Sequence, residues 1–342
     1  MKKSLFILAT AAIALASCNN DVKIAENKTL GNPNQQKEIG FFPLSEKSAR
    51  MQAPAARAQY AVTTTTFPAD NTMEVKAYQT QPSPGAYFDK TTFSKDGTYW
   101  KGGQYWPLSA AKLNFFAVSG YGVSASHITI TDALATAGVA YTTANSYSAT
   151  TQSDIMYAFG RGEVTKNVNA LSFPNNVDMQ FKHALALVDF EVKGYSAVET
   201  SAITVNSITL KGATYNGTLT LTNTNAATES DAVTTAILWA AGDVVATQTV
   251  PGISSGTAIG ADFARIGNGL MVIPGTGFTS FVINYSLNGN NYDYEYTPSP
   301  AVSSTTANNK YTYQITFKLH EILINPSVDT WTNTNSGITI VE

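Results

Sequence analysis

The chain of 342 residues has very little of the chemistry that builds metal and redox sites, with one cysteine and three histidines. Because Cys18 is the only thiol, an internal disulfide, a site of several thiolates and a CxxC redox motif are all excluded. His127, His183 and His320 each stand alone, without HExxH spacing or a carboxylate-rich loop. We therefore expect no metal site and no cofactor, and assign His183 a structural role.

Charged residues are also scarce, at 13% of the chain, and the formal net charge is −3. This balance provides neither a basic field for nucleic acid nor an acidic tail. Hydrophobic residues make up 44% of the chain, which is enough to build real cores and argues against wholesale disorder. The length allows two domains of roughly 100–200 residues each.

Catalytic motifs are missing as well. The sequence holds no GxSxG, P-loop or dinucleotide-binding fingerprint. Asp293 and Glu295 alternate on one expected strand, where solvated charge is the ordinary interpretation. Residues 160–163, Gly-Arg-Gly-Glu, lack the Asp of an integrin-type tripeptide, so we expect a turn there. These absences predict a protein that is not an enzyme.

The N-terminus carries an export signal. Lys2 and Lys3 precede an apolar run, residues 5–16, which is too short to span a bilayer, so residues 1–17 are predicted to be a signal peptide. The run ends in Leu-Ala-Ser-Cys, which resembles a bacterial lipobox with Cys18 as the lipidated residue. Acylation there would anchor the precursor in the outer membrane at the cell surface. An ordinary signal peptide with an incidental cysteine is the alternative.

The rest of the chain reads as β structure. Residues 18–37 are polar and without period, which predicts a flexible tether. Beyond them, period-two alternation recurs between turn signals at Asn216-Gly217 and Asn288-Gly289. Long amphipathic helices are missing, and residues 232–241 are the best candidate for a short one. The pattern predicts an all-β chain of sandwiches, with a domain boundary in residues 172–177.

Two stretches invite a functional interpretation. The strand-like residues 38–44, EIGFFPL, lead into residues 48–58, SARMQAPAARA, an expected exposed loop in which Arg50 and Arg57 have no obvious partner. Farther on, Trp100 and Trp106 lie in a cluster of four aromatic residues. Their rings could stack on sugars, or they could pack on the core as part of a hairpin. Both interpretations remain open from the sequence.

The order of segments resembles the fimbrillin family of Bacteroidetes, the Mfa-like and FimA-like pilin subunits. The similarity covers nearly the whole mature chain, and each piece is short. In chain order, it rests on the lipobox, Ile39-Gly-Phe, the Arg-containing loop, Val75-Lys-Ala-Tyr, Trp106-Pro-Leu, Leu113-Asn-Phe-Phe-Ala, Asp154-Ile-Met-Tyr-Ala, residues 177–188, Leu270-Met-Val-Ile-Pro, Tyr311-Thr-Tyr-Gln-Ile and Val328-Asp-Thr-Trp.

The resemblance implies two transthyretin-like Greek-key β-sandwich domains in tandem, here residues 38–175 and 176–342. It also implies a lipoprotein precursor that an Arg-specific protease cuts in the loop behind the first strand. Loss of that strand opens a groove, and a strand of another subunit fills it. The cut is expected after Arg57, with Arg50 in reserve. The donor is expected in residues 332–342, through Ile338 and Ile340, although this tail could instead be an edge strand of its own domain.

The function expected from this resemblance is that of a stalk or tip subunit of a cell-surface fimbria, active in adhesion. Its partners would be other fimbrial subunits joined by β-strand addition, the outer membrane through the lipid anchor of the precursor, and a host or glycan ligand. The alternative is a monomeric cell-surface glycan-binding lipoprotein of a polysaccharide-uptake system, which would use Trp100 and Trp106.

Overall fold

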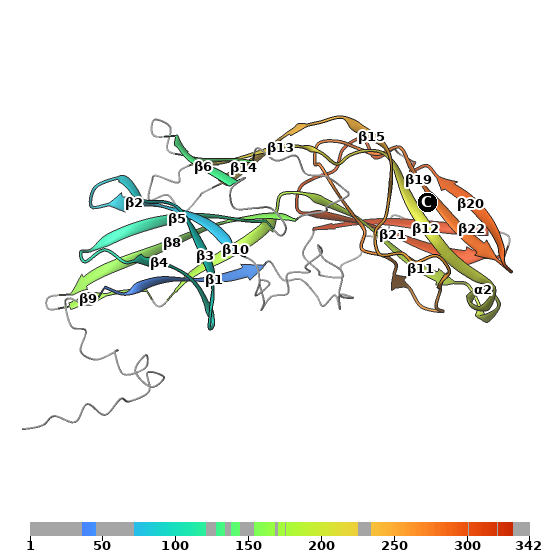
Figure 1. Ribbon diagram of the computed structural model, residues 1–342, viewed down its shortest axis with the longest axis horizontal. Helices are drawn as coiled ribbons and strands as arrows, with labels where there is room; N and C mark the ends of the chain where they lie inside the picture. Colours follow the sequence, from blue (N-terminus) through green and yellow to red (C-terminus); the bar gives the residue numbers. More distant parts are fainter. Residues whose placement is uncertain are drawn as a thin grey trace, which may run out of the picture.

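The computed structural model describes ten stretches of the chain, and most of their residues lie in strands. One helix, α2 (Ala197–Ala202), occurs among them. The expectation of an all-β fold is therefore confirmed. The strands gather in two groups that lie side by side along the long axis of the molecule (Figure 1). The described stretches are residues 36–45, 72–120, 128–133, 138–143, 154–167, 170–174, 176–224, 234–299, 301–319 and 321–330.

The first group is an eight-stranded sheet that folds over on itself. Its order is β10-β1-β4-β3-β2-β5-β8-β9, and β10 also pairs with β8, so the ladder closes around a core. The sheet turns at β3 and β10. Strand β3 pairs with β4 on one side and β2 on the other, and β10 pairs with β1 and β8. The strands are β1 (Glu38–Ser45), β2 (Met73–Gln81), β3 (Gly85–Asp96), β4 (Tyr99–Tyr105), β5 (Ala111–Gly120), β8 (Ile155–Asn167), β9 (Ala170–Ser172) and β10 (Val177–His183).

Strand β10 pairs within the first group, so the first group extends farther along the chain than the predicted boundary at residues 172–177. The sequence placed the boundary at residues 172–177 and assigned everything beyond it to the second half. In the structure, β10 pairs with β1 and β8, and Val177, Met179 and Phe181 lie in the same core as β1. The passage to the second group therefore begins after His183. The alternation in residues 177–183 predicts a half-buried strand, but it carries no information about which sheet that strand joins.

The second group is built from two five-stranded sheets. One has the order β17-β11-β21-β22 with β18 also on β11, and the other has the order β15-β12-β19-β20 with β16 also on β12. Phe190, Phe281 and Tyr313 meet between them with ring centroids 5.0–5.9 Å apart. The strands are β11 (Ala186–Gly194), β12 (Ile203–Thr214), β15 (Val244–Thr249), β16 (Thr257–Ala258), β17 (Ala264–Arg265), β18 (Leu270–Val272), β19 (Ser280–Leu287), β20 (Asn290–Tyr296), β21 (Asn309–Lys318) and β22 (Glu321–Thr330).

A fourth sheet connects the two groups. Its order is β14-β13-β7-β6, with strands β6 (Ile128–Ala133), β7 (Gly138–Thr143), β13 (Gly217–Thr224) and β14 (Thr234–Ala241). The register from Thr209↔Thr249 in the second group to Thr224↔Thr234 in this sheet is unbroken. Strands β12 and β13 therefore form one continuous antiparallel ribbon with β14 and β15. At its far end, Leu219 and Leu221 pack against residues of β5 and β8.

Two local predictions can be compared directly with the structure. The hairpin at Asn288-Gly289 is confirmed between β19 and β20, with φ of 51° and 82° at the turn as a type I′ turn requires. The helix expected at residues 232–241 is wrong, because residues 234–241 form β14. The β-branched and aromatic residues Thr235, Ile237 and Trp239 favour a strand, and pairing with β13 along its whole length decides the outcome.

Helix α2 was not predicted, although its start carries a recognisable signal. Ser196 is the N-cap and Glu199 reaches back to it in a capping box. The hydrogen bond from Ser196, together with backbone donors, lowers the pKa of Glu199. The motif Ser-x-x-Glu could therefore have identified this helix from the sequence. A helix of six residues is too short for the periodicity of its apolar residues to show.

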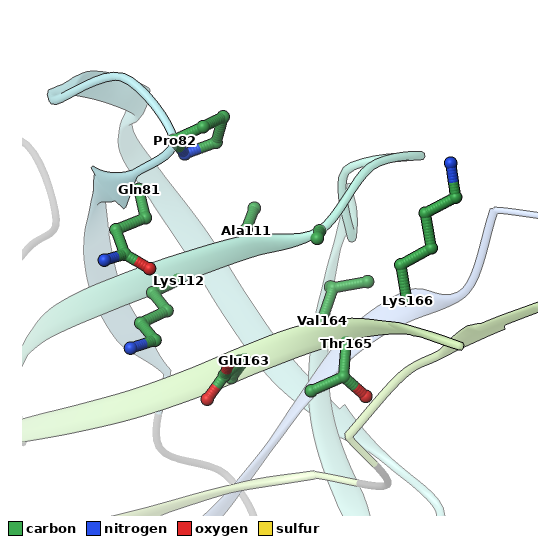
Figure 2. Close-up of a pocket in the computed structure, with 9 residues that line it drawn as sticks. Gln81, Pro82, Ala111, Lys112, Glu163, Val164, Thr165 and Lys166 are labelled. Carbon is green, nitrogen blue, oxygen red and sulfur yellow. The ribbon is translucent and has the colours of Figure 1, made fainter. Parts of the chain in front are cut away.

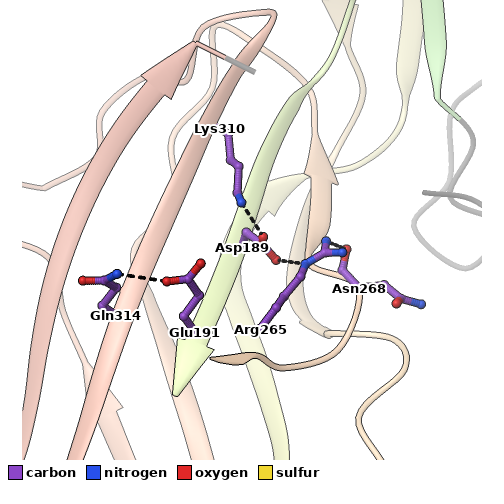
Figure 3. Close-up of polar contacts among 6 residues, drawn as sticks. All are labelled: Asp189, Glu191, Arg265, Asn268, Lys310 and Gln314. Carbon is purple, nitrogen blue, oxygen red and sulfur yellow. Dashed lines mark hydrogen bonds and ion pairs between the residues drawn. The ribbon is translucent and has the colours of Figure 1, made fainter. Parts of the chain in front are cut away.

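A buried carboxylate on β11 joins three elements of the second group (Figure 3). Asp189 is fully buried, and Arg265 Nε donates to its Oδ1 at 2.7 Å. Lys310 Nζ lies 2.9 Å from its Oδ2, a contact that is an ion pair and not a well-directed hydrogen bond. A second Arg265 nitrogen donates to the carbonyl of Asn268. The carboxylate thus fixes β11, β17 and β21 around one charge.

Replacing this carboxylate tests how much it contributes to the free energy of unfolding. We expect Asp189→Ala to lower the free energy of unfolding by about 3 kcal/mol, because Arg265 and Lys310 lose their shared partner. Urea denaturation of the full chain measures this change. The matched control is Glu321→Ala, which removes the exposed 3.0 Å pair with Lys318 and should cost less than about 1 kcal/mol. Equal losses in the two variants would contradict the assignment.

Candidate functional site

Strand β1 lies between β4 and β10 in the first group, and we call the position that it fills the seat of β1. It runs parallel to β10, from Phe41↔Val177 to Ser45↔Phe181, and antiparallel to β4. In Figure 1 it is the blue arrow between β4 and β10, at the lower side of the group. It is the first described strand of the chain, and 27 residue positions, 46–72, separate it from the start of β2. We consider this seat the candidate functional site.

The side of β1 that faces the core provides its apolar anchors. Ile39 and Phe41 are both 0% exposed. The Phe41 ring meets Phe93 at a centroid distance of 4.8 Å and Phe115 at 5.1 Å, both edge to face. Burial of two such side chains stabilises the seated strand by roughly 1.5–3 kcal/mol each, and aromatic pairs add about 0.5–1.5 kcal/mol. Phe42 points to the opposite side and is only half-buried, with Tyr99 at 6.3 Å.

Polar contacts fix the start of β1. The Trp106 amide donates to the carbonyl of Lys37 at 2.9 Å, and the Gly103 amide donates to Glu38 Oε1 at 3.1 Å. Lys101 Nζ lies 3.8 Å from Glu38 Oε2 and 2.8 Å from Asp96. The hydrogen bond to Asp96 raises the pKa of Lys101, so the ammonium stays charged beside Glu38. These contacts fix the register in which the strand enters the sheet.

The two halves of β1 are held differently. Strand β4 pairs with β1 from Glu38 to Phe41, whereas β10 pairs with it from Phe41 to Ser45, so each half has a ladder on one side. Pro43, which has no N–H to donate, lies in the half that pairs with β10 alone. The first half also carries the hydrogen bond from Gly103 to Glu38 and the buried Ile39, so we expect the second half to open at a lower free-energy cost. It is also the half that precedes Arg50 and Arg57 in the sequence.

Two glycines of β8 let neighbouring groups approach this core. A Cβ at Gly160 would lie 2.4 Å from Met179 Sδ, and one at Gly162 would lie 2.3 Å from the indole of Trp106. These residues lie inside β8, so the turn predicted at residues 160–163 is wrong. Their function is close packing, because any side chain would displace Met179 of β10 or Trp106.

The aromatic cluster proves to be part of the core. Trp100 is 3% exposed and Trp106 is 1% exposed, and both belong to the apolar cluster that contains Ile39 and Phe41. Trp106 packs edge to face on Phe115 at 5.7 Å. Of the two interpretations of this cluster, the structure supports core packing, because neither indole presents a face to solvent. Tyr105, which is 45% exposed, is the member of the cluster that reaches the surface.

A shallow pocket of about 470 Å³ lies on the same group, at one end of β2, β5 and β8 (Figure 2). Its charged side chains are those of Lys112, Glu163 and Lys166, and the cis Gln81-Pro82 bond forms part of its wall. Among the described residues, no group of three or more His, Cys, Asp and Glu residues could hold a metal ion.

His183 has the structural role that its sequence context suggested. Its Nδ1 lies 2.7 Å from Asp154 Oδ2 in a buried pair, and its backbone N–H donates to Asn308 Oδ1 at 3.0 Å. Asn308 precedes β21, so the end of β10 is tied to the second group. His127 and His320 lie outside the described residues. Within those residues, no helix has the length and apolar character that crossing a bilayer requires.

The remaining predicted residues cannot be placed. Cys18, Arg50, Arg57, Ile338 and Ile340 lie outside the described residues. The structure does place the strand that precedes the arginines. It adds two features that the sequence reasoning did not single out, the buried Ile39 and the contacts of Glu38 with Gly103 and Lys101, which we call the polar clasp. The i, i+2 spacing of Ile39 and Phe41 could have identified the buried face of β1. The contact of Glu38 with Gly103 joins residues far apart in the chain, so no local signal reveals it.

Comparison with known proteins agrees with this architecture. A fimbrial protein from Bacteroides vulgatus matches 87% of this chain and 100% of its own, with 17% identity and a TM-score of 0.51. A protein from Bacteroides ovatus, named after a proposed role in cell adhesion, matches 90% of this chain and 99% of its own, with 12% identity and a TM-score of 0.51. At these identities the likeness shows a shared fold.

Sequence comparison identifies the family. No curated protein matches the chain. A family model described as fimbrillin-like matches residues 57–331, which leaves β1 outside the matched range. Because this match covers far more than half of the 342 residues, the chain belongs to the fimbrillin-like family.

Proposed function

We propose that this protein is a stalk or tip subunit of a cell-surface fimbria, and that it polymerises by exchanging strand β1 for a strand of another subunit. The observation that carries the proposal is the seat of β1. A single N-terminal strand fills the middle of a sheet, inserts two fully buried anchors, and is followed by a long connection that contains two arginines. Family membership supports the fimbrial part of the proposal.

An empty seat would be a strong acceptor. Without β1, the backbone groups of β10 and β4 that now face it would lose their partners, and Phe93 and Phe115 would lose the packing of Phe41. Unpaired edges and exposed apolar side chains are both satisfied when an extended strand is added. Cleavage in the loop converts a bound strand of the same chain into one that can leave. A precursor that cannot polymerise through the β1 position can therefore become a subunit that can.

The tail of the chain has a suitable pattern for a donor. Ile338 and Ile340 are two residues apart, as are Ile39 and Phe41. Side chains with this spacing lie on one face of a strand, about 6.6 Å apart, so the isoleucines could enter the pockets that Ile39 and Phe41 vacate. Thr339 between them would face away. Lipidation of Cys18 would hold the precursor at the outer membrane until cleavage after Arg57, or after Arg50, releases the anchored segment together with β1.

Cleavage is the first step to test. We expect the full chain to form ladders of SDS-resistant polymers after treatment with an Arg-specific protease, whereas Arg50→Ala together with Arg57→Ala should form no SDS-resistant polymer because β1 cannot leave. Size-exclusion chromatography and unheated gels measure the outcome. The single variants assign the cut to one arginine. Polymers formed by the uncut double variant would show that assembly does not depend on loss of β1.

The donor tail is tested separately. We expect Ile338→Asn with Ile340→Asn to leave cleavage intact but to reduce polymer yield at least ten-fold, because two polar side chains would enter apolar pockets. Thr339→Asn is the matched control and should polymerise as the unmodified chain does. Equal yields from the two variants would rule out the tail as donor while leaving the seat of β1 as acceptor.

The anchoring role of Phe41 gives a further prediction. We expect Phe41→Ala to lower the free energy of unfolding of the uncut chain by about 3–5 kcal/mol, because it leaves a cavity between Phe93 and Phe115. Phe42→Ala, on the half-buried side of the same strand, should cost much less. After protease treatment, the Phe41 variant should also lose β1 faster, as measured by mass spectrometry of the retained fragment. Similar values for the two variants would contradict the inward assignment of Phe41.

A further inference from the structure

Strand β14 is an open edge of the fourth sheet. Among the described strands it pairs with β13 alone, at all eight positions from Thr234 to Ala241. The chain then continues through Gly242 and Asp243 into β15, which in turn pairs with β12 on one side only. The ribbon that connects the two strand groups therefore presents one long outer strand edge. This edge plays no part in strand exchange at β1.

The direction of the backbone groups on β14 follows from one hydrogen bond. The Gly242 N–H donates to the carbonyl of Asn216 at 2.8 Å, and the two residues lie opposite each other in the unbroken register. Because hydrogen-bonded and non-hydrogen-bonded pairs alternate in an antiparallel ladder, even-numbered residues of β14 bond to β13. The N–H and C=O groups of Thr235, Ile237, Trp239 and Ala241 therefore point away from β13, toward the open side.

This edge lacks the protection that other edges of the molecule carry. Edge strands are commonly blunted by charge, proline or bulges. Strand β22 has Glu321, Pro326 and Asp329, and β20 has Asp293 and Glu295. Residues 234–249, in contrast, contain one charged residue, Asp243, and no proline. A strand edge of this length without such protection favours pairing with another strand.

The two faces of β14 differ in a way that suits pairing. On the inner face, Ile237 and Trp239 pack against the layer below, and Trp239 Nε1 donates to the carbonyl of Ala184 at 2.9 Å. On the outer face, Ala236 and Ala240 are exposed, and Leu238 is 67% exposed. The inner contacts hold the strand rigid, while the outer face leaves one large apolar side chain in solvent at the middle of the strand.

We propose that β14 is a docking edge for a second copy of this chain, whose own β14 pairs with it antiparallel about a two-fold axis at Leu238. In this register Leu238 lies opposite its counterpart, Ala236 lies opposite Ala240, and Ile237 lies opposite Trp239. Thr235 pairs with Ala241. All four residues with outward-pointing backbone groups are then hydrogen-bonded in both copies.

The argument for a second copy is self-complementarity. A strand that pairs antiparallel with itself forms an isologous contact, which closes after two chains and needs no second binding surface. Between Thr234 and Ala241 no charge opposes another, and the two Leu238 side chains cover each other. Moving the axis to Ile237 or Trp239 would leave outward-pointing groups unpaired and Leu238 opposite an alanine. The register centred on Leu238 satisfies the most groups.

A single cysteine at the axis tests this register. The test protein is the full chain with Cys18→Ser, which leaves no native thiol. Residues 238 of the two copies would form a non-hydrogen-bonded pair with a Cα–Cα distance of about 4.5 Å, which a disulfide can bridge. We expect Leu238→Cys to give disulfide-linked dimers under mild oxidation. Non-reducing gels of the uncut chain measure the dimer fraction.

Matched controls come from the same face of the same strand. Ala236→Cys alone and Ala240→Cys alone should each give at least ten-fold less dimer than Leu238→Cys, because neither residue meets its own counterpart. Mixing these two variants should restore cross-linking, since residue 236 of one copy lies opposite residue 240 of the other. Equal cross-linking of all three single variants, or none in the mixture, would overturn the proposed register.

A second measurement does not depend on disulfide chemistry. Leu238→Lys places two ammonium groups face to face and should weaken dimerisation in sedimentation velocity at least ten-fold. Tyr292→Lys, which replaces an exposed side chain on β20, should leave dimerisation unchanged. A chain that stays monomeric at about 100 µM, or a Leu238→Cys thiol that is protected from alkylation within a monomer, would overturn the proposal.

The consequence for assembly rests on the proposed function. Strand exchange at β1 would join subunits along a fimbria, whereas pairing of β14 edges would join subunits of neighbouring fimbriae side by side. Pairing at β14 needs neither cleavage nor an empty seat, so it is measured on the uncut chain. Its failure would leave strand exchange intact, and failure of strand exchange would leave the dimer test unaffected.

Discussion

The first group of strands depends on the insertion of β1 between β10 and β4. Without it the closed ladder would be interrupted at one point, because no other described strand joins β10 to β4. Ile39 and Phe41 fill the core at this point, and the Phe41 ring contacts both Phe93 and Phe115, at shorter centroid distances than Phe88 does. The stability of the whole layer is therefore linked to a strand at the start of the chain, far in sequence from its partners. The contacts that stabilise the uncut chain are therefore the same contacts that the proposed strand exchange would have to break.

The distribution of contacts along β1 also sets a direction for opening. The start of the strand pairs with β4 and is also held by the hydrogen bond from Gly103 to Glu38, whereas the half that contains Pro43 pairs with β10 alone. Local opening begins where the fewest hydrogen bonds must break. An incoming strand would therefore gain its first contacts with β10, near Phe181, and displace β1 toward Glu38. The same asymmetry keeps the uncut strand in register, because its tightly held end is the one farther from the loop.

Sequence reasoning succeeded where the determining interactions are local, and it failed where partners are distant. Alternation identified the strands of the second group, and Asn288-Gly289 identified its hairpin, because side-chain period and turn geometry depend on neighbouring residues. The assignment of β10 to the first group and the packing of Trp106 on Gly162 depend on residues tens of positions away. The strand at residues 234–241 carries a local signal in its β-branched and aromatic residues, which the helix prediction gave too little weight. For the candidate site, the sequence indicated a strand at residues 38–44, but the position of that strand between β4 and β10 is visible only in three dimensions.

The continuous ribbon explains how one strand could leave without loss of the surrounding fold. Leu219 and Leu221 of β13 pack on Phe116, Val118, Ile155 and Tyr157, which lie on the face of β5 and β8 that points away from the seat. Adjacent residues of β5 therefore serve different layers, since Phe115 contacts β1 while Phe116 lies under the ribbon. If β1 leaves, β5 and β8 on the opposite side of the core still pack against β13 through their outer face. A groove supported in this way keeps its shape and does not have to be rebuilt by the incoming strand, which lowers the ordering cost of binding.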